Sequence, residues 1–156
     1  MMLMRAQFTI VLLALVCASA AHCESLPDHC AILPTSQGPA LIKQCSRGSP
    51  PGVTNFWSPT PEQVIAIEKL LPELLRKNHL ISHISDSRHQ YVGIVSDGRK
   101  LIYLNSFPKD AFAGSSVQLD WKTKAVIVCD GGSAFWGVEF DPADNTFHNL
   151  ETNGNA

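Results

Sequence analysis

The sequence predicts an α+β domain in which one amphipathic helix packs on an antiparallel sheet of about four strands. Two observations indicate this fold class. Apolar residues recur at helical spacing over 61–77, and two stretches in the C-terminal half are typical of β-hairpins. An element with one apolar face needs a second layer to cover it, so the helix and the sheet are expected to bury each other.

The helix over 61–77 has a well-marked start and one apolar face. Thr60 can cap it, Pro61 suits the first helical position, and Gln63 completes a T-x-x-Q capping box. Pro72 is expected to kink or split the helix, because proline has no N–H for the carbonyl group four residues earlier. The apolar residues at three- and four-residue steps, which predict the buried face, are Val64, Ile67, Leu70, Leu71, Leu74 and Leu75.

The first hairpin is predicted over 89–107, where Asp97 and Gly98 separate two runs rich in β-branched and aromatic residues. This dipeptide favours a two-residue turn, because both positions tolerate positive φ. Such a turn pairs Ser96 with Arg99. Both faces of the two runs are largely apolar, so the hairpin is expected to be covered on both sides.

The second hairpin is predicted to join 125–129 to 134–140 through a glycine-rich turn. Pairing Cys129 with Ala134 would put Cys129 and Trp136 on one apolar face, where a disulfide or an inert thiol is expected. A turn over 141–145 and a last strand over 146–151 complete the sheet.

The first 20 residues are typical of a secretory signal peptide, with one early positive charge and small residues before the expected cleavage near Ala20. Their apolar segment is roughly half as long as a membrane-spanning helix. The sequence therefore predicts a periplasmic or secreted protein without a membrane span. About 135 residues remain, which suits one domain. We expect an extended, disulfide-tied arm over 21–57 and an α+β domain over 58–156.

Removal of the signal peptide also changes the number of cysteines from five to four, because Cys17 leaves with it. An even number in an oxidising compartment favours two disulfides. Four cysteines allow three connectivities. Among these we expect Cys23 with Cys30, and Cys45 with Cys129, the second bridge tying the arm to the sheet.

The element order, one helix followed by an antiparallel run of strands, resembles that of the cystatin-like α+β rolls. By analogy, this order implies a similar roll. The inhibitory Q-x-V-x-G motif of that family has only a shortened counterpart in Gln90-Tyr91-Val92-Gly93, and no Pro-Trp pair follows in a later hairpin. The activity of that family is therefore not carried over.

Charge and motifs argue against several classes of partner. Once Arg5 is removed, the remaining Lys and Arg are outnumbered by the 14 Asp and Glu, and no basic run occurs. This balance does not suit nucleic acid or an anionic membrane surface. The glycines at 131 and 132 lead into a predicted strand rather than a helix N-terminus, so they do not predict a phosphate site. We expect no cofactor.

Two groups of residues would support an enzyme, which is the alternative function. Cys129 or Ser133 would be the nucleophile of a small hydrolase, but their turn lacks the G-x-S-x-G pattern and no base is oriented beside it. His79, His83 and His89 would bind the ion of a metal-dependent enzyme, but they match no fixed ligand spacing. We therefore expect no catalytic residue and no metal ligand.

Glu139 is the residue that most favours a binding site. It lies in an apolar strand on the face opposite Trp136, and a buried carboxylate is costly unless something compensates it. Tyr91 and Phe135 are expected to line a groove with it, the alternative being that this face is solvated. The sequence thus predicts a small exported, non-enzymatic binding protein, an inhibitor or immunity-type partner that binds a protein or small ligand outside the cytoplasm.

Overall fold

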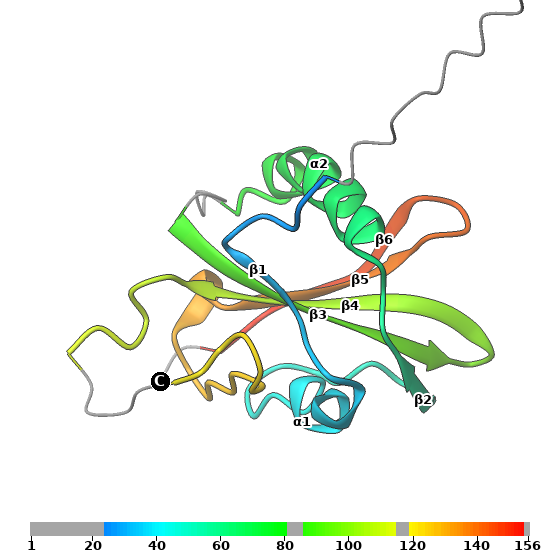
Figure 1. The fold of residues 1–156 in the computed structure, drawn as a ribbon. Coiled ribbons are helices and arrows are strands. Elements are labelled where there is room, and N and C mark those ends of the chain that lie inside the picture. The colour runs from blue at the N-terminus through cyan, green and yellow to red at the C-terminus, as the bar shows by residue number, and fades with distance from the viewer. Residues whose placement is uncertain (1–23, 81–85, 115–118, 155–156) are drawn as a thin grey trace, which may run out of the picture.

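The computed structural model describes residues 24–80, 86–114 and 119–154, and this part is a mixed α+β fold built on a six-stranded sheet (Figure 1). The strand order is β1-β3-β4-β5-β6, and β2 also pairs with β3. The strands are β1 (Cys30–Ile32), β2 (Val53–Trp57), β3 (Ser87–Ser96), β4 (Arg99–Pro108), β5 (Trp136–Asp141) and β6 (Thr146–Thr152). The helices are α1 (Gly38–Leu41) and α2 (Pro61–Lys77), with 3-10 turns η1 (Thr35–Gln37) and η3 (Gly132–Ala134).

Helix α2 spans the residues that the apolar spacing indicates. Its capping box is formed, because the Gln63 N–H donates to the Thr60 hydroxyl group and the Thr60 N–H donates to the Gln63 side chain. The helix continues through Pro72 to Lys77 and is not split there. Leu70, which the spacing assigned to the buried face, is 39% exposed. The helix therefore presents a narrower apolar stripe than expected.

The sheet lies between two layers, with α2 on one face and α1 on the other (Figure 1). The apolar residues on the α2 face are Cys30, Val64, Ile67, Leu71, Leu75, Tyr91, Ile102, Leu104, Trp136, Val138 and Phe140. Those on the opposite face are Ala31, Leu33, Leu41, Ile42, Val92, Ile94, Leu101 and Tyr103. Successive side chains of β3 and β4 alternate between these two cores, so the central hairpin is covered on both sides.

The β3–β4 hairpin confirms the first predicted turn. Ser96 pairs with Arg99, and the two residues between them have positive φ, 47° at Asp97 and 79° at Gly98. Positive φ at both central positions gives a turn whose twist matches that of the strands. The register predicted from this turn is therefore correct along the hairpin.

The second predicted hairpin is wrong. Strand β5 pairs with β4 and β6, while 125–129 is not a strand and Ile127 is 47% exposed. Side-chain amides bind this segment instead. The Val126 N–H donates to Gln90, and the Val126 carbonyl group accepts from Gln44 and Asn105. These bonds replace a strand neighbour, so β-propensity does not decide the outcome. The predicted turn over 141–145 and the last strand are present as the β5–β6 hairpin.

The segment before α2 is part of the sheet rather than an extended arm outside it. Strand β1 pairs in parallel with residues 89–91 of β3, and β2 pairs antiparallel with residues 93–96 of the same strand. The unpaired backbone groups along an edge of β3 are thereby satisfied by two short strands from the N-terminal segment. This raises the number of strands from the expected four to six.

One of the two expected disulfides is present, because Cys45 is bonded to Cys129. Cys30 is a free, buried thiol, so the expected bridge from Cys30 to Cys23 is not formed in the structure. Cys23 itself, together with the predicted signal peptide, lies outside the described residues. Within the described ranges, no helix is both long enough and apolar enough to span a membrane.

Candidate functional site

A pocket of about 270 Å³ opens on the face of the sheet opposite α2. One wall is the loop over 47–51 between α1 and β2, and the floor comes from β4, β5 and β6. Strand alternation explains which residues reach it, because Trp136 and Val138 point to α2 and the residues between and after them point the other way. The lining residues are Arg47, Gly48, Ser49, Pro50, Pro51, Tyr103, Gly137, Glu139, Asn149 and Glu151.

A β-bulge directs Asn149 toward this pocket. The β5–β6 register shifts between Gly137 and Glu139, and Asn149 on the opposite strand has a left-handed φ of 51°. The Asn149 side-chain amide donates to Glu139 Oε1 at 3.1 Å. Bulges often occur beside functional sites because they turn a side chain out of the regular alternation. Here the bulge gives Glu139 a neutral hydrogen-bond partner, and no ion pair to this carboxylate is formed among the described residues.

Two buried polar atoms beside Glu139 have no hydrogen-bond partner among the described residues. They are Arg47 Nε and the Tyr103 hydroxyl group. The terminal nitrogens of Arg47 donate to Asn105 and Asn153. Only 9% of Arg47 and 3% of Tyr103 is exposed. Buried polar atoms of this kind are rare in folded proteins, so each one needs a physical explanation.

Gly137 keeps the floor of the pocket open. A Cβ atom at this position would lie 2.6 Å from the Tyr103 hydroxyl oxygen and 3.1 Å from Arg47 Nε. The two unpartnered atoms therefore face the same side of β5, above a residue without a side chain. Any larger residue at position 137 would occupy the space next to them.

The electrostatics of the pocket are set by one guanidinium and two carboxylates. Burial raises the pKa of Glu139, and the hydrogen bond from Asn149 only partly opposes this. Burial also raises the pKa of Tyr103, although the neighbouring Arg47 guanidinium opposes this, and the hydroxyl group stays protonated. Glu151 accepts from the Gly48 N–H at 2.6 Å. The pocket thus offers donors from Arg47 and Tyr103 next to acceptors from the carboxylates.

Of the three residues expected to line one groove, only Glu139 lines this pocket. Tyr91 is fully buried on the α2 face, where its hydroxyl group donates to Glu68. Phe135 is half-buried and packs beside Gly131. Sequence alternation indicated the correct face for Glu139, but Tyr91 belongs to the opposite core and Phe135 lies just before β5.

A second polar group lies on the α2 face, around the carboxylate of Glu68. His89 Nδ1 lies 2.7 Å from Glu68 Oε1, the Cys30 thiol donates to the same oxygen at 3.0 Å, and His29 Nε2 lies 3.2 Å from Oε2. Tyr91 donates its hydroxyl group to Oε1 as well. We call these five residues the Glu68 cluster.

The carboxylate of Glu68 is held in its charged form. Burial alone would raise the pKa of Glu68, but the hydrogen bonds from His89, Tyr91 and Cys30 outweigh it and lower this pKa to about 2. Burial and the neighbouring carboxylate raise the pKa of the Cys30 thiol far above its usual range. Cys30 is therefore not an activated nucleophile, since a reactive cysteine needs its thiolate form.

The sequence patterns did not predict the Glu68 cluster. One signal for it is present, because Glu68 lies between Val64 and Leu71 at four- and three-residue steps, within the buried stripe of α2. A carboxylate in such a stripe needs buried partners. These partners come from residues far away in the sequence, which no local pattern identifies.

The residues proposed for an enzyme are not gathered into one site. Cys129 is half of a disulfide and has no free thiol, which overturns its role as a nucleophile. Ser133 and His79 are exposed, and His83 lies outside the described residues. His89 is fully buried in the Glu68 cluster. Two groups in the described ranges have the geometry of a metal site, and neither includes His79.

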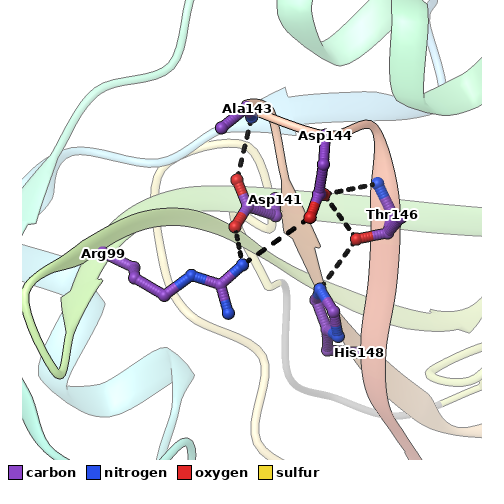
Figure 2. A network of polar contacts seen from close by, with 6 residues as sticks. All are labelled: Arg99, Asp141, Ala143, Asp144, Thr146 and His148. Atoms are coloured by element: carbon purple, nitrogen blue, oxygen red, sulfur yellow. Dashed lines mark hydrogen bonds and ion pairs between the residues drawn. The ribbon is translucent and has the colours of Figure 1, made fainter.

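The second group with the geometry of a metal site consists of Asp141, Asp144 and His148, and it lies at the β5–β6 turn (Figure 2). Asp141 accepts from Arg99, and Asp144 accepts from the hydroxyl group of Thr146 at 2.5 Å. That hydroxyl group also lies 2.8 Å from His148 Nε2. Arg99 already neutralises the buried carboxylate of Asp141, and each drawn side chain has a partner within the network. The arrangement therefore explains how the hairpin is closed without any ligand.

No protein-family model matches this chain, and neither does any curated protein or solved structure. Its function therefore has to be argued from the geometry of the described residues.

Proposed function

We propose that this protein is a small exported, non-enzymatic binding protein, and that the pocket at Arg47, Tyr103 and Glu139 holds a polar group of its partner. Export follows from the signal peptide predicted at the N-terminus. The partner is a second protein outside the cytoplasm, which inserts one side chain or chain terminus into the pocket. This accounts for a pocket of about 270 Å³, which is small for most ligand sites.

The unpartnered atoms of Arg47 and Tyr103 are the observation that supports this proposal most directly. Leaving a buried donor without a partner costs about 1–3 kcal/mol. The fold accepts this cost at two neighbouring atoms, next to a carboxylate whose hydrogen-bonding partner in the described part of the chain is a neutral amide. A bound group that satisfies all three would recover that free energy on binding, and this is how polar specificity arises in a pocket.

The chemistry of the lining residues defines the bound group. Arg47 Nε can only donate, so the group must offer an acceptor, while Glu139 and Glu151 call for donors. A carboxamide side chain or an amino-acid-like zwitterion offers both. A purely anionic group would meet two carboxylates, and a purely apolar group would leave the polar atoms unsatisfied.

The hydrolase alternative loses one of its two candidate nucleophiles, because Cys129 is bonded to Cys45. The bulge at Asn149 fits a binding role, since it supplies a neutral hydrogen bond to Glu139 rather than a group that could exchange protons with it. A binding pocket needs fixed donors and acceptors, and these are the groups that line this one.

The test is capture of secreted proteins by the purified exported protein and by its Gly137→Ala variant. The new methyl group would lie within 2.6 Å of the Tyr103 hydroxyl oxygen, so it fills the floor of the pocket. We expect the wild type to retain a partner and Gly137→Ala to lose it. A parallel measurement adds free glutamine and glycine and follows the melting temperature, which separates a small ligand from a protein partner.

Gly154→Ala is the matched control, because its new Cβ would only reach an ordinary contact distance of 3.8 Å from Ser46. This variant should capture as well as the wild type. Equal capture by Gly137→Ala would show that the partner binds elsewhere, and this result would refute the pocket as the binding site.

A further inference from the structure

We propose that His29, Cys30, Glu68 and His89 form a binding site for a divalent transition-metal ion of the zinc class. This site lies on the α2 face, away from the pocket at Glu139, and the inference does not depend on the function proposed for that pocket. It assigns a role to a buried group of side chains that partner binding leaves unexplained.

The donor atoms are the first argument. One atom from each of the four residues lies within 4.8 Å of all the others. Zinc holds sulfur at about 2.3 Å and nitrogen or oxygen at about 2.0–2.2 Å, so donors in a tetrahedral site are roughly 3.3–3.8 Å apart. The four residues therefore need to move by an ångström or less to surround an ion.

The types of donor select the ion. A thiol, two imidazoles and one carboxylate make a mixed S, N and O set, which is the set that zinc uses in proteins. Calcium and magnesium take oxygen ligands, so they do not suit Cys30 or the histidines. Four protein donors fill a tetrahedral shell, which favours a structural or storage site over a catalytic one with an open position.

Rigid elements hold the donors in place. Cys30 and His89 are paired across the parallel β1–β3 ladder, and the His89 N–H donates to the His29 carbonyl group at 2.8 Å. Glu68 reaches the same point from the third turn of α2. Tyr91 binds Glu68 through its hydroxyl group and so orients the carboxylate from behind, as outer residues of metal sites do.

Exposure decreases across the group. The side chain of His29 is 31% exposed, that of Glu68 is 9% exposed and that of His89 is fully buried. A surface depression of about 350 Å³ is lined in part by Cys30 and Asp28. The group is therefore most accessible from the side of His29.

A purely structural reading leaves one feature without a reason. Cys30 keeps a free thiol in a protein predicted for export, where thiols usually form disulfides. On the opposite face, buried polar contacts are made mainly by neutral amides. A metal ion accounts for the choice of thiol and imidazole here.

The experiment is zinc titration of the purified exported protein after removal of metal with a chelator, followed by metal analysis. We expect one zinc ion per chain. Cys30→Ser should weaken binding by at least about 100-fold, and Tyr91→Phe by about 10-fold, because it removes only an outer contact. Cobalt(II) serves as a second probe. Its thiolate absorption band should appear with the wild type and disappear with Cys30→Ser.

Two controls locate the ion. His79→Ala changes an exposed histidine outside the group and should leave the affinity unchanged. His148→Ala removes a donor of the group at the β5–β6 turn and should also have no effect. Loss of zinc with His148→Ala and its retention with Cys30→Ser would overturn the proposal, as would failure of the folded wild type to bind zinc or cobalt.

If Cys30→Ser fails to fold, His29→Ala takes its place, because His29 lies at the exposed edge of the group and contacts Glu68 through one ring nitrogen. We expect at least about a 10-fold loss of affinity from it. Unchanged affinity in a folded His29→Ala protein would likewise refute the assignment.

Discussion

The two faces of the sheet satisfy their buried polar groups with different chemistry. On the α1 face, buried polar contacts are made mainly by the neutral amides of Gln44, Gln90, Asn105 and Asn153, which bind the backbone of the loop over 121–130. On the α2 face, the buried polar contacts converge on one carboxylate, that of Glu68.

An amide has fixed donors and acceptors, so its contribution does not change with pH or with the presence of an ion. A carboxylate surrounded by thiol, imidazole and phenol groups depends on where the protons are. The amide face therefore suits permanent structure, and the Glu68 cluster suits a site that responds to its surroundings.

The largest effect is expected from the disulfide that fastens the amide face. Replacing Cys45 and Cys129 together with serine opens a loop of 84 residues. The chain-entropy model assigns about 4.5 kcal/mol to such a loop. Urea unfolding of the wild type and the double variant measures the loss. A reducing agent should destabilise the wild type and leave the variant unchanged, and equal stability of the two proteins would contradict the expectation.

Gln90 and Tyr91 are adjacent in β3 and point to opposite faces of the sheet. Substitutions at these two positions therefore compare the two faces directly. Gln90→Leu leaves the Val126 N–H and the carbonyl groups of Trp121 and Lys124 without their partner. We expect a loss of about 3 kcal/mol in the free energy of unfolding. Tyr91→Phe removes one hydrogen bond and should cost about 1.5 kcal/mol. A larger loss from Tyr91→Phe would reverse the ranking of the faces.

Acid should weaken the α2 face selectively. The pKa of Glu68 is lowered in the folded protein to about 2, below its usual value of 4.5. The stability that Glu68 contributes is therefore present above pH 4.5 and is lost as the pH falls toward 2. In Glu68→Gln, measured with a chelator present, the free energy of unfolding should depend less on pH across this window. Gln90→Leu is the control and should keep the wild-type dependence.

The smallest effect is expected at the pocket. The pKa of Glu139 is raised in the folded protein, so its contribution to stability is present below pH 4.5 and lost as the pH rises through the folded value. Glu139→Gln keeps an acceptor for Asn149 and removes the charge. It should stabilise the protein by less than about 1 kcal/mol at pH 7. Thermal unfolding at pH 4 and pH 7 tests this, and destabilisation at pH 7 would be the contrary result.

Sequence patterns predicted the parts of the fold that depend on neighbours in the chain. The capping box at Thr60 and the turn at Asp97 and Gly98 are local signals with one main outcome each. The strand at 125–129 was mispredicted, because Gln90 and Asn105, which bind Val126, are more than 20 residues away. Long-range hydrogen bonds override local propensity in that segment.

Local patterns likewise predicted only part of each candidate site. Alternation along β5 placed Glu139 on the correct face, but its companions in the pocket come from a loop and from a bulge at Asn149 that no local pattern showed. His29 and His89 are brought together by a parallel pair of strands whose register is not encoded in either segment alone. Such sites become visible only when the pairing is known.

The parallel β1–β3 pair also sets an order of events during folding. Residues 30–32 precede residues 89–91 in the chain, yet they can pair only after β3 has formed, which delays a contact between distant parts of the chain. In a chain that is exported as we propose, the thiol of Cys30 is open to oxidants until that moment. Under the proposed export, the relative rates of β1 docking and Cys30 oxidation therefore decide what fraction of chains keeps a reduced thiol.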